Sequence, residues 1–549
     1  MYFSKETELD TNEVLRGFAR CENVVTSTMG PFGRNVFVFG EGEPTFTKDG
    51  ITALRYNSWA EPLDRAIAQL LIDAATKTLR SEGDGTTTTV LLASRLAHRL
   101  LPSIAVNANI HSLLADLERI KKEVIEQFKA AAMQVANAQT VVDVATIAAN
   151  GDKVLGELIG KLAYSVGEFG TIIAQTSTTS LTHTKQMDGW MVDSKEVPIP
   201  LRPEFILDIS KRCTELDEPL IVLTDITIRE LSTIQPIMDI WQKGNKESSK
   251  MRPLVFVVQD MEGAPLATIV GNLQRGIPIF VIKAPYFMEN RADILEDMRI
   301  LTGAKRIFSN MKGASMKSFT AEDFGSCSKL TFWANRMVLQ PREDSFHIGV
   351  AVEKRKADLK KALSNVDLEE MQSDFIKMRL ARFDGGIGFI YVGGQTEVES
   401  KNLFMVVDDA QRAAFSAMKG GVVVGGGATF LAVKRNIELM YRSDIHGIDK
   451  VFLDLLEEPF NKIANLACIS AEEVEVAKMK VVAKFGTTFD HDNYKHKLVY
   501  SLTERQIVDG VERGIIEPVR VPIAAIENAV SIVKLFIQSK IGIELQNIK

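Results

Sequence analysis

Residues 81–96 read SEGDGTTTTVLLASRL and place two glycines around one aspartate, four threonines after them, and an apolar pattern behind those. Threonine is disfavoured inside helices but suits their first turn, and apolar residues then recur at helical spacing, at Val90, Ala93, Leu96 and Leu100. The stretch therefore predicts a loop that leads into the N-terminus of a helix. The first backbone N–H groups of a helix lack partners and lie at the positive end of its dipole, so phosphate is a natural ligand there.

Asp84, in the middle of this loop, would repel a bare phosphate. The repulsion is removed if a divalent cation lies between the two groups, because carboxylate and phosphate oxygens are the ligands that Mg²⁺ prefers. The alternative is a structural Gly-Asp-Gly turn with threonine capping, and the residue types alone leave both interpretations open.

Four other short segments have residue types suited to binding a nucleotide. TMGPFGRN at 28–35 and GGGAT at 425–429 bring glycines to helix ends, where backbone N–H groups can approach a ligand. TKDG at 47–50 places a cation beside an anion at a turn, and DDAQRAA at 408–414 places two acids on a helical pattern. A plain helix stop would also explain the first segment, and the TKDG pattern is common in surface hairpins. Of the adjacent Asp408 and Asp409, only one can face a given site. The sequence has neither a G-x-x-x-x-G-K-[ST] motif nor a strand-linked G-x-G-x-x-G motif.

Length and composition indicate a multidomain protein without an electrostatic reason to bind nucleic acid. The chain has 549 residues, which predicts two to four domains, and a formal net charge of −6. Its four cysteines are far apart, so a disulfide framework or a zinc site is not expected. The N-terminus resembles neither a signal peptide nor a transit peptide, and no stretch reads as a membrane span. We expect a cytoplasmic protein that acts neither on nucleic acid nor in a membrane.

The hydrophobic pattern divides the chain into helical ends and an α/β insert. Residues 1–130 are mostly helical in pattern, with a hairpin at NVFVFGEGEPTFTKDG, and the pattern returns to helix after the DGGIGFIYVGG segment. The final IENAVSIVKLFIQSKIGI stretch also reads as an amphipathic helix. Residues 187–385 instead alternate apolar strands with helices, which is typical of a sheet with parallel strands. Helical ends around an α/β insert predict a discontinuous domain.

Taken together, these motifs resemble group I chaperonins, the GroEL-like family. The matching segments occur in the family's order and at similar spacing: TMGPFGRNVFV, TKDGIT, EGDGTTTTVL, ATIAANGD, EGAPLATIVGN, IKAPYF followed by LTGA, GGIGFIYVGGQTEVE and GGVVVGGG. The resemblance extends over nearly the whole chain, so this sequence is identified as a divergent member.

The resemblance implies a multidomain α and α/β fold of three domains. It implies a mostly helical equatorial ATP-binding domain at 1–130 and 420–549, a small intermediate hinge domain at 131–187 and 388–419, and an α/β apical substrate-binding domain at 188–387. It also implies a homo-oligomeric ring, usually of seven subunits, that encloses unfolded or partially folded proteins and is driven by ATP and Mg²⁺.

The family's nucleotide site carries over to named positions of this chain. Asp84 would be the Mg²⁺ ligand, Asp49 would flank the γ-phosphate, and Asp409 would orient the attacking water when the hinge closes. The remaining nucleotide-binding positions would be Thr28, Met29, Gly30, Pro31, Lys48, Gly85, Thr86, Thr87, Thr88, Ile147, Gly425, Gly426, Ile463, Tyr500 and Glu517. Glu517 stands where the family usually has aspartate.

Substrate would bind in an exposed apolar groove between two apical helices, at Met238, Leu266 and Val270. Helical periodicity alone favours a buried core face at these positions, and the resemblance favours the groove. Gln235 and Gly271 depart from the family's aliphatic residues there, which leaves binding of a separate co-chaperonin lid open. Asn461 and Ala471 replace a charged pair at the expected ring-to-ring contact, which leaves single and double rings open.

The expected function is an ATP-dependent chaperonin that captures non-native proteins and assists their folding in a ring-shaped cage. The alternative is a non-cycling holdase or assembly protein that retains the chaperonin fold. The presence of Asp49, Asp84 and Asp409 favours the ATPase.

Overall fold

The computed structural model describes most of the chain. The described residues are 2–39, 45–57, 59–104, 109–168, 170–177, 179–187, 189–193, 199–209, 212–246, 251–309, 316–342, 346–364, 370–384, 387–441, 445–482 and 497–547. Residues 483–496 and the tip of the 35–50 hairpin, at 40–44, lie outside them.

The chain forms two compact units, each discontinuous in sequence. Unit 1 comprises residues 1–164, 174–184 and 390–549, and unit 2 comprises residues 165–173 and 185–389. Both chain ends thus fold into one unit around an inserted one, as the helical, α/β and helical texture predicts. The finer division into equatorial, intermediate and apical domains stays a prediction.

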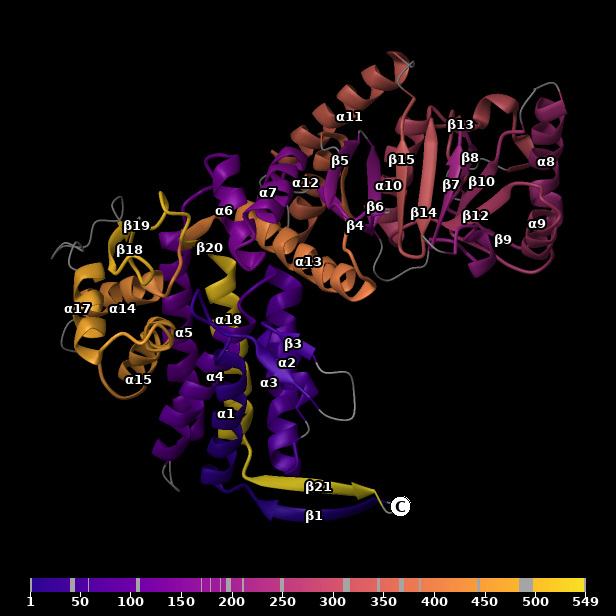
Figure 1. Ribbon diagram of the computed structural model, residues 1–549. Helices are drawn as coiled ribbons and strands as arrows, with labels where there is room; N and C mark the ends of the chain where they lie inside the picture. The colour runs from indigo at the N-terminus through magenta and orange to yellow at the C-terminus, as the bar shows by residue number, and fades with distance from the viewer. Residues whose placement is uncertain are drawn as a thin grey trace. The chain divides into compact units, whose positions relative to one another are not determined.

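Unit 1 is mainly helical (Figure 1). Its helices, which include most of α7, are α1 (Thr11–Thr26), α2 (Gly50–Tyr56), α3 (Pro62–Glu82), α4 (Thr86–Leu100), α5 (Ile110–Ala131), α6 (Ala138–Ala148), α7 (Lys153–Val166), α13 (Glu397–Gly420), α14 (Ala428–Tyr441), α15 (Gly447–Leu455), α16 (Glu458–Leu466), α17 (Ala471–Val482) and α18 (Arg520–Gln538).

The core of unit 1 is a bundle in which α1, α3, α4, α5 and α18 lie side by side (Figure 1). Helix α4 is buried along most of its length, and α18 packs on α3, α4 and α5. By length and composition α18 is the one described helix that could cross a membrane, but 61% of that apolar window is buried inside the protein. It is therefore a core helix of this bundle.

Short strands complete unit 1. Strands β2 (Val36–Val38) and β3 (Thr45–Thr47) pair antiparallel, which confirms the predicted hairpin. Strand β17 (Val422–Val424) pairs with β20 (Ile516–Pro518), and β18 (Leu498–Ser501) pairs with β19 (Gln506–Asp509). The terminal strands β1 (Tyr2–Glu8) and β21 (Ile541–Asn547) also pair antiparallel.

The last pair corrects one expectation about the C-terminal segment. The predicted helix over IENAVSIVKLFIQSKIGI ends at Gln538, and Ser539 already has extended backbone. Ile541 and Ile543 then belong to β21 because strand pairing with β1 replaces helical hydrogen bonding for these residues.

Unit 2 contains the expected βαβ arrangement. Strands β8 (Leu220–Leu223), β10 (Leu254–Val258) and β12 (Ile279–Lys283) are parallel in the order β12-β10-β8, with β13 (Gly325–Ser326) antiparallel at the edge. Helices α8 (Leu231–Lys246) and α9 (Ala264–Gln274) are the crossovers between them. Residues at both ends of β10 are fully buried, which is typical of a parallel strand covered on two faces.

The remaining elements of unit 2 surround this sheet. A second sheet has the order β6-β15-β14-β7 and is antiparallel throughout. Its strands are β6 (Trp190–Asp193), β15 (Arg336–Gln340), β14 (Lys329–Trp333) and β7 (Cys213–Asp217). The other elements of unit 2 are β9 (Thr227–Ile228), β11 (Asp260–Met261), α10 (Met288–Thr302), α11 (Phe346–Leu363) and α12 (Glu370–Asp384). The strands β4 (Thr171–Thr176), β16 (Ile387–Val392) and β5 (His183–Met187) form a three-stranded sheet in this order, and each strand contains residues assigned to both units.

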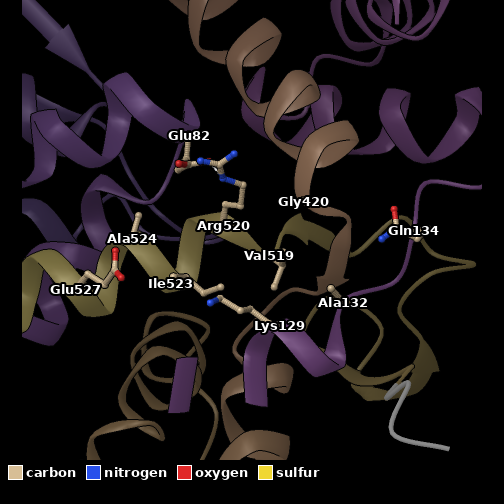
Figure 2. Close-up of a pocket in the computed structure, with 10 residues that line it drawn as sticks. All are labelled: Glu82, Lys129, Ala132, Gln134, Gly420, Val519, Arg520, Ile523, Ala524 and Glu527. Carbon is tan, nitrogen blue, oxygen red and sulfur yellow. Dashed lines mark ion pairs between the residues drawn. The ribbon is translucent and has the colours of Figure 1, made fainter. Parts of the chain in front are cut away.

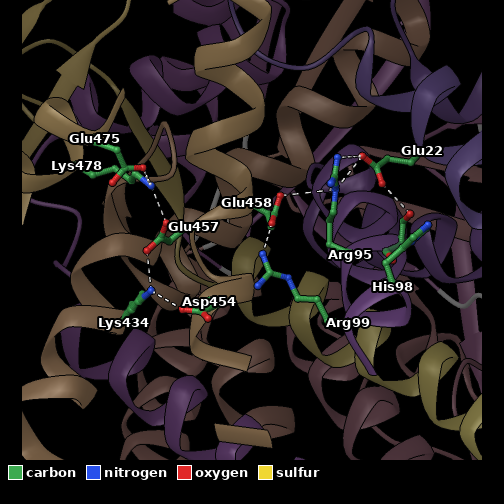
Figure 3. A network of polar contacts seen from close by, with 11 residues as sticks. Glu22, Arg95, His98, Arg99, Lys434, Asp454, Glu457, Glu458, Glu475 and Lys478 are labelled. Atoms are coloured by element: carbon green, nitrogen blue, oxygen red, sulfur yellow. Dashed lines mark hydrogen bonds and ion pairs between the residues drawn. The ribbon is translucent and has the colours of Figure 1, made fainter. Parts of the chain in front are cut away.

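Ion pairs join elements of unit 1 that are far apart in sequence (Figure 3). The buried Glu22 of α1 accepts hydrogen bonds from Ser94 at 2.7 Å and from the Arg95 guanidinium at 2.6 Å, both on α4. Glu458 of α16 in turn pairs with Arg99. Burying a carboxylate is costly unless it is paired and hydrogen-bonded, so these partners fix α4 against α1 and α16.

Candidate nucleotide site

The turn before α4 has a backbone that favours glycine at two positions. Gly83 ends α3 with φ = 76°, and Gly85 precedes α4 with φ = 88°. Residues with a Cβ rarely adopt this left-handed conformation. Gly85 also provides no side-chain cap, so the first N–H groups of α4 have no capping acceptor from it. The predicted loop leading into a helix is confirmed, with α4 starting at Thr86, and the open end of this helix can bind an anion.

The four threonines divide into one structural residue and three free ones. The buried Thr89 donates its hydroxyl to the Gly85 carbonyl at 2.9 Å and lies 3.0 Å from the Thr78 hydroxyl. Within the described residues, the half-buried hydroxyls of Thr86, Thr87 and Thr88 have no hydrogen-bond partner. These three hydroxyls remain available to a ligand at the end of α4.

Asp84 lies between the two glycines and accepts a hydrogen bond from the Gly85 N–H at 2.6 Å. Removal from water raises the pKa of Asp84 above its ordinary value, although this hydrogen bond opposes the rise. A nearby cation would stabilise the charged form of this partly desolvated carboxylate, so Asp84 is suited to bind Mg²⁺.

Asp409 lies close enough to two other predicted carboxylates, Asp49 and Asp84, for their charges to act on it. Burial is the main cause that raises the pKa of Asp409, on α13, to about 7. The charges of Asp408, Asp49 and Asp84 raise it further, and Arg412 opposes the rise. Excess negative charge gathered at a helix N-terminus is the arrangement expected for a site that takes a cation together with phosphate.

Asp49 also has a structural task, because it caps α2. Its Oδ1 accepts from the Ile51 N–H and its Oδ2 from the Thr52 N–H, both at 3.1 Å. The cap fixes the direction of this exposed carboxylate. The neighbouring half-buried Lys48 has no ion-pair partner within the described part of the chain.

The loop after α1 contacts the apolar cluster that contains Ile463. A Cβ at Gly30, where φ is 69°, would lie 3.1 Å from the Ile463 side chain. Met29, Ile463 and Tyr500 are all buried in this cluster. The Thr28 hydroxyl donates to the Val25 carbonyl at 2.8 Å, and Pro31 is exposed. The structure thus brings the first loop together with Ile463 and Tyr500, two of the predicted nucleotide-binding positions.

Tyr500 is oriented by a polar contact, since its hydroxyl donates to Glu473 at 2.5 Å. Burial, followed by this hydrogen bond, raises the pKa of Tyr500.

The GGGAT glycines have different surroundings. A Cβ at Gly425 would find its nearest neighbour at 3.6 Å, and one at Gly426 would find the Val499 side chain at 3.3 Å. At Gly427 it would lie 2.6 Å from the Phe460 backbone nitrogen, so that glycine serves close packing. Gly425 and Gly426 therefore keep the space that a close-lying nucleotide requires.

Glu517 lies on β20, opposite Val423 of β17 in the strand register. Burial raises its pKa to about 8, and the charge of Asp84 contributes. Glu517 is therefore within electrostatic reach of the turn before α4. A carboxyl group that is protonated near neutral pH can donate a hydrogen bond as well as accept one.

Two further observations bear on the predicted ligands. Ile147, near the end of α6, is 43% exposed, and its role in nucleotide binding stays a prediction. Among the described residues, no three His, Cys, Asp or Glu side chains could hold a metal ion together. Mg²⁺ often takes only one or two carboxylates and completes its shell with phosphate oxygens and water. The residues present therefore fit Mg²⁺ bound together with a nucleotide.

The predicted apical groove differs from its expectation. Met238 and Leu266 are 6% and 7% exposed and belong to the core of unit 2, and Val270 is partly buried against that core. Exposure was therefore the wrong expectation for Met238 and Leu266, because both side chains pack into the hydrophobic core of unit 2. A binding role for all three residues stays a prediction.

Sequence reasoning missed several residues that shape the site. Gly83 was part of the quoted motif, and its pairing with Gly85 around an aspartate was the available signal. Glu82 and Ser416 had no signal, because they meet from positions more than 300 residues apart.

The fold and this site can be compared with known proteins. The model of the TCP-1/cpn60 chaperonin family matches residues 21–228 and 280–540. Two crystal structures of the chaperonin gp146 from the bacteriophage EL 2 (Pseudomonas aeruginosa), both in presence of ATP-BeFx, have similar folds. The first has a TM-score of 0.73 at 18% identity, covering 97% of this chain and 98% of that one. The second has a TM-score of 0.72 at 18% identity, covering 98% of both chains.

Proposed function

This chain belongs to the TCP-1/cpn60 chaperonin family, and we propose that it hydrolyses ATP to drive the capture and folding of non-native proteins inside a ring. Family membership and the chaperonin fold confirm the resemblance noted in the sequence. The proposal for ATP chemistry is carried by one observation: α13 packs on Gly83 beside the open N-terminus of α4, where the charges of Asp49 and Asp84 both act on Asp409.

The nucleotide would bind with its phosphates at the start of α4. The free hydroxyls of Thr86, Thr87 and Thr88 would donate to phosphate oxygens, together with the backbone N–H groups of the first turn. Lys48 would neutralise phosphate charge, and Asp84 would hold Mg²⁺, which supplies charge neutralisation when bound. Glu517 would hydrogen-bond the ribose, with Gly425, Gly426 and Ile463 around the rest of the nucleoside.

Asp409 would act on the attacking water. Its pKa of about 7 is suitable for a group that accepts a proton near neutral pH. Phosphoryl transfer needs positioning and charge neutralisation more than a covalent nucleophile, and this chain supplies both with the groups named above.

Client capture would depend on exposed apolar side chains of unit 2. Several are more than half exposed: Leu207, Ile209, Met251, Phe287, Met288 and Val350. Exposed apolar area binds collapsed chains without sequence specificity, because its burial contributes about 25 cal/mol per Å² whichever side chain supplies it. The family model leaves residues 229–279, a part of unit 2, unmatched. We therefore expect this segment to bind clients with a preference particular to this chain.

The proposal is tested by measuring phosphate release from ATP and molecular mass on the same purified protein. We expect a ring, usually of seven subunits per layer, and hydrolysis that stops when a chelator removes Mg²⁺. A ring that captures an unfolded test protein but releases no phosphate would instead show a non-cycling holdase. A monomer that binds no ATP would overturn the proposal altogether.

A further inference from the structure

Helix α13, which carries Asp409, lies against the turn that carries Asp84. A Cβ at Gly83 would lie 2.5 Å from the Ala413 nitrogen and 2.6 Å from the Asp409 carbonyl oxygen. The Arg412 guanidinium also donates to the Arg80 carbonyl, near the end of α3, at 3.0 Å. The position of Asp409 therefore depends on what holds α13 against this end of α3.

Glu82, the last residue of α3, makes the buried polar contact between these helices. Its Oε2 accepts a hydrogen bond from the Ser416 hydroxyl of α13 at 2.6 Å and pairs with Nε of Arg520 at 3.2 Å. Glu82 and Ser416 are each 4% exposed. Figure 2 shows Glu82 and Arg520 facing each other at the wall of a cavity of about 400 Å³, with Gly420 of α13 nearby.

The spacing on α13 relates this contact to Asp409. Ser416 follows Asp409 by seven positions, which is two helical turns, so both residues lie on the same face of α13. Arg520 begins α18 directly after β20, the strand that carries Glu517. Glu82 thus joins three elements, each of which carries or adjoins a predicted nucleotide residue.

A buried carboxylate requires charged or hydrogen-bonded partners, and hydrogen bonds to a charged group are stronger than neutral ones. If α13 moved away from α3, Glu82 would lose Ser416 but could keep Arg520, which belongs to α18. The Ser416 contact therefore favours the docked position of α13 specifically.

We propose that Glu82 is a positioning residue for ATP hydrolysis, which acts through Ser416 to hold Asp409 at the nucleotide site. This inference rests on the proposed function, since it assumes that Asp409 acts in hydrolysis. Binding of nucleotide to the α4 turn does not require the contact, so its loss affects the hydrolytic step alone.

The test compares single-turnover hydrolysis and equilibrium ATP affinity in assembled protein. Ser416→Ala should slow hydrolysis about tenfold, the effect of losing one hydrogen bond to a buried charge, with affinity unchanged. Glu82→Gln should slow it less, because its amide oxygen still accepts from Ser416. Ser81→Ala is the control, since among the described residues the Ser81 hydroxyl hydrogen-bonds only to carbonyl groups of α3.

A double variant separates positioning from general stability. If Ser416 acts through Asp409, Ser416→Ala should add nothing to the defect of Asp409→Ala, whereas a structural role gives additive losses. Hydrolysis at the parent rate in Ser416→Ala, or additive losses in the double variant, would overturn the inference. A parent rate in Asp409→Ala itself would instead remove the proposed role of Asp409.

Discussion

The sequence predicted binding sites both at the turn before α4 in unit 1 and on helices α8 and α9 in unit 2. The structure has the predicted geometry at the turn but not on the two helices. At the turn, Gly83 and Gly85 have positive φ and Thr86 begins the helix, as the motif predicts. At α8 and α9, Met238 and Leu266 face the core instead of solvent. Glycine and threonine report a backbone geometry, whereas apolar periodicity reports one buried face without saying what covers it.

We expect the strongest effect from replacing a buried residue of α9 in unit 2. Leu266→Ser should destabilise unit 2 by about 4 kcal/mol, because it leaves a cavity and buries a hydroxyl. Leu207→Ser, at a residue 55% exposed, should leave the melting temperature nearly unchanged while weakening capture of an unfolded protein. Thermal melting and a capture assay on both variants measure this. A Leu266→Ser protein with unchanged melting and lost capture would restore the exposed groove.

The next effect tests the unit 1 side. Asp84→Asn should weaken Mg²⁺-dependent ATP affinity by about two orders of magnitude, since an amide cannot neutralise a bound cation. Nucleotide titration at several Mg²⁺ concentrations measures the loss. If the Mg²⁺ dependence were unchanged, the Gly-Asp-Gly segment would be a structural turn only.

A smaller effect concerns pH. The folded pKa of Asp409 is raised to about 7 from an ordinary value of 3.8, so at pH 6 most of this carboxyl is protonated and cannot accept a proton. The kcat/KM for ATP reports the free enzyme and should fall about tenfold per pH unit below 7. The same shift means that the folded protein binds this proton more tightly than the unfolded chain, so Asp409 favours folding more as pH falls through 7. A pH profile that is flat from 6 to 8 would contradict the assignment.

Much of the fold could be predicted from the sequence, because short-range patterns of residue types determine the individual elements. The hairpin at 35–50, the βαβ order of β8, β10 and β12, and the start of α4 each follow from period and turn chemistry. The sequence did not reveal that Asp49 both caps α2 and lies near Asp409, because these contacts depend on the three-dimensional fold.

Contacts between distant segments were equally hidden. The Glu82 contact with Ser416 and the pairing of β1 with β21 could not be predicted, because neither contact produces a local sequence pattern in the segments that it joins. The burial of Leu266 depends on the sheet beneath α9, and periodicity could not decide it.

We propose that Asp409 completes a hydrolytic site at the start of α4. Asp409→Ala should keep ATP affinity within about twofold and slow single-turnover hydrolysis by about two to three orders of magnitude, because this residue acts on water and not on the nucleotide. Equilibrium binding and single-turnover phosphate release, measured on the same preparation, test this directly. Loss of hydrolysis with binding preserved is the predicted result, and hydrolysis at the parent rate would contradict the claim.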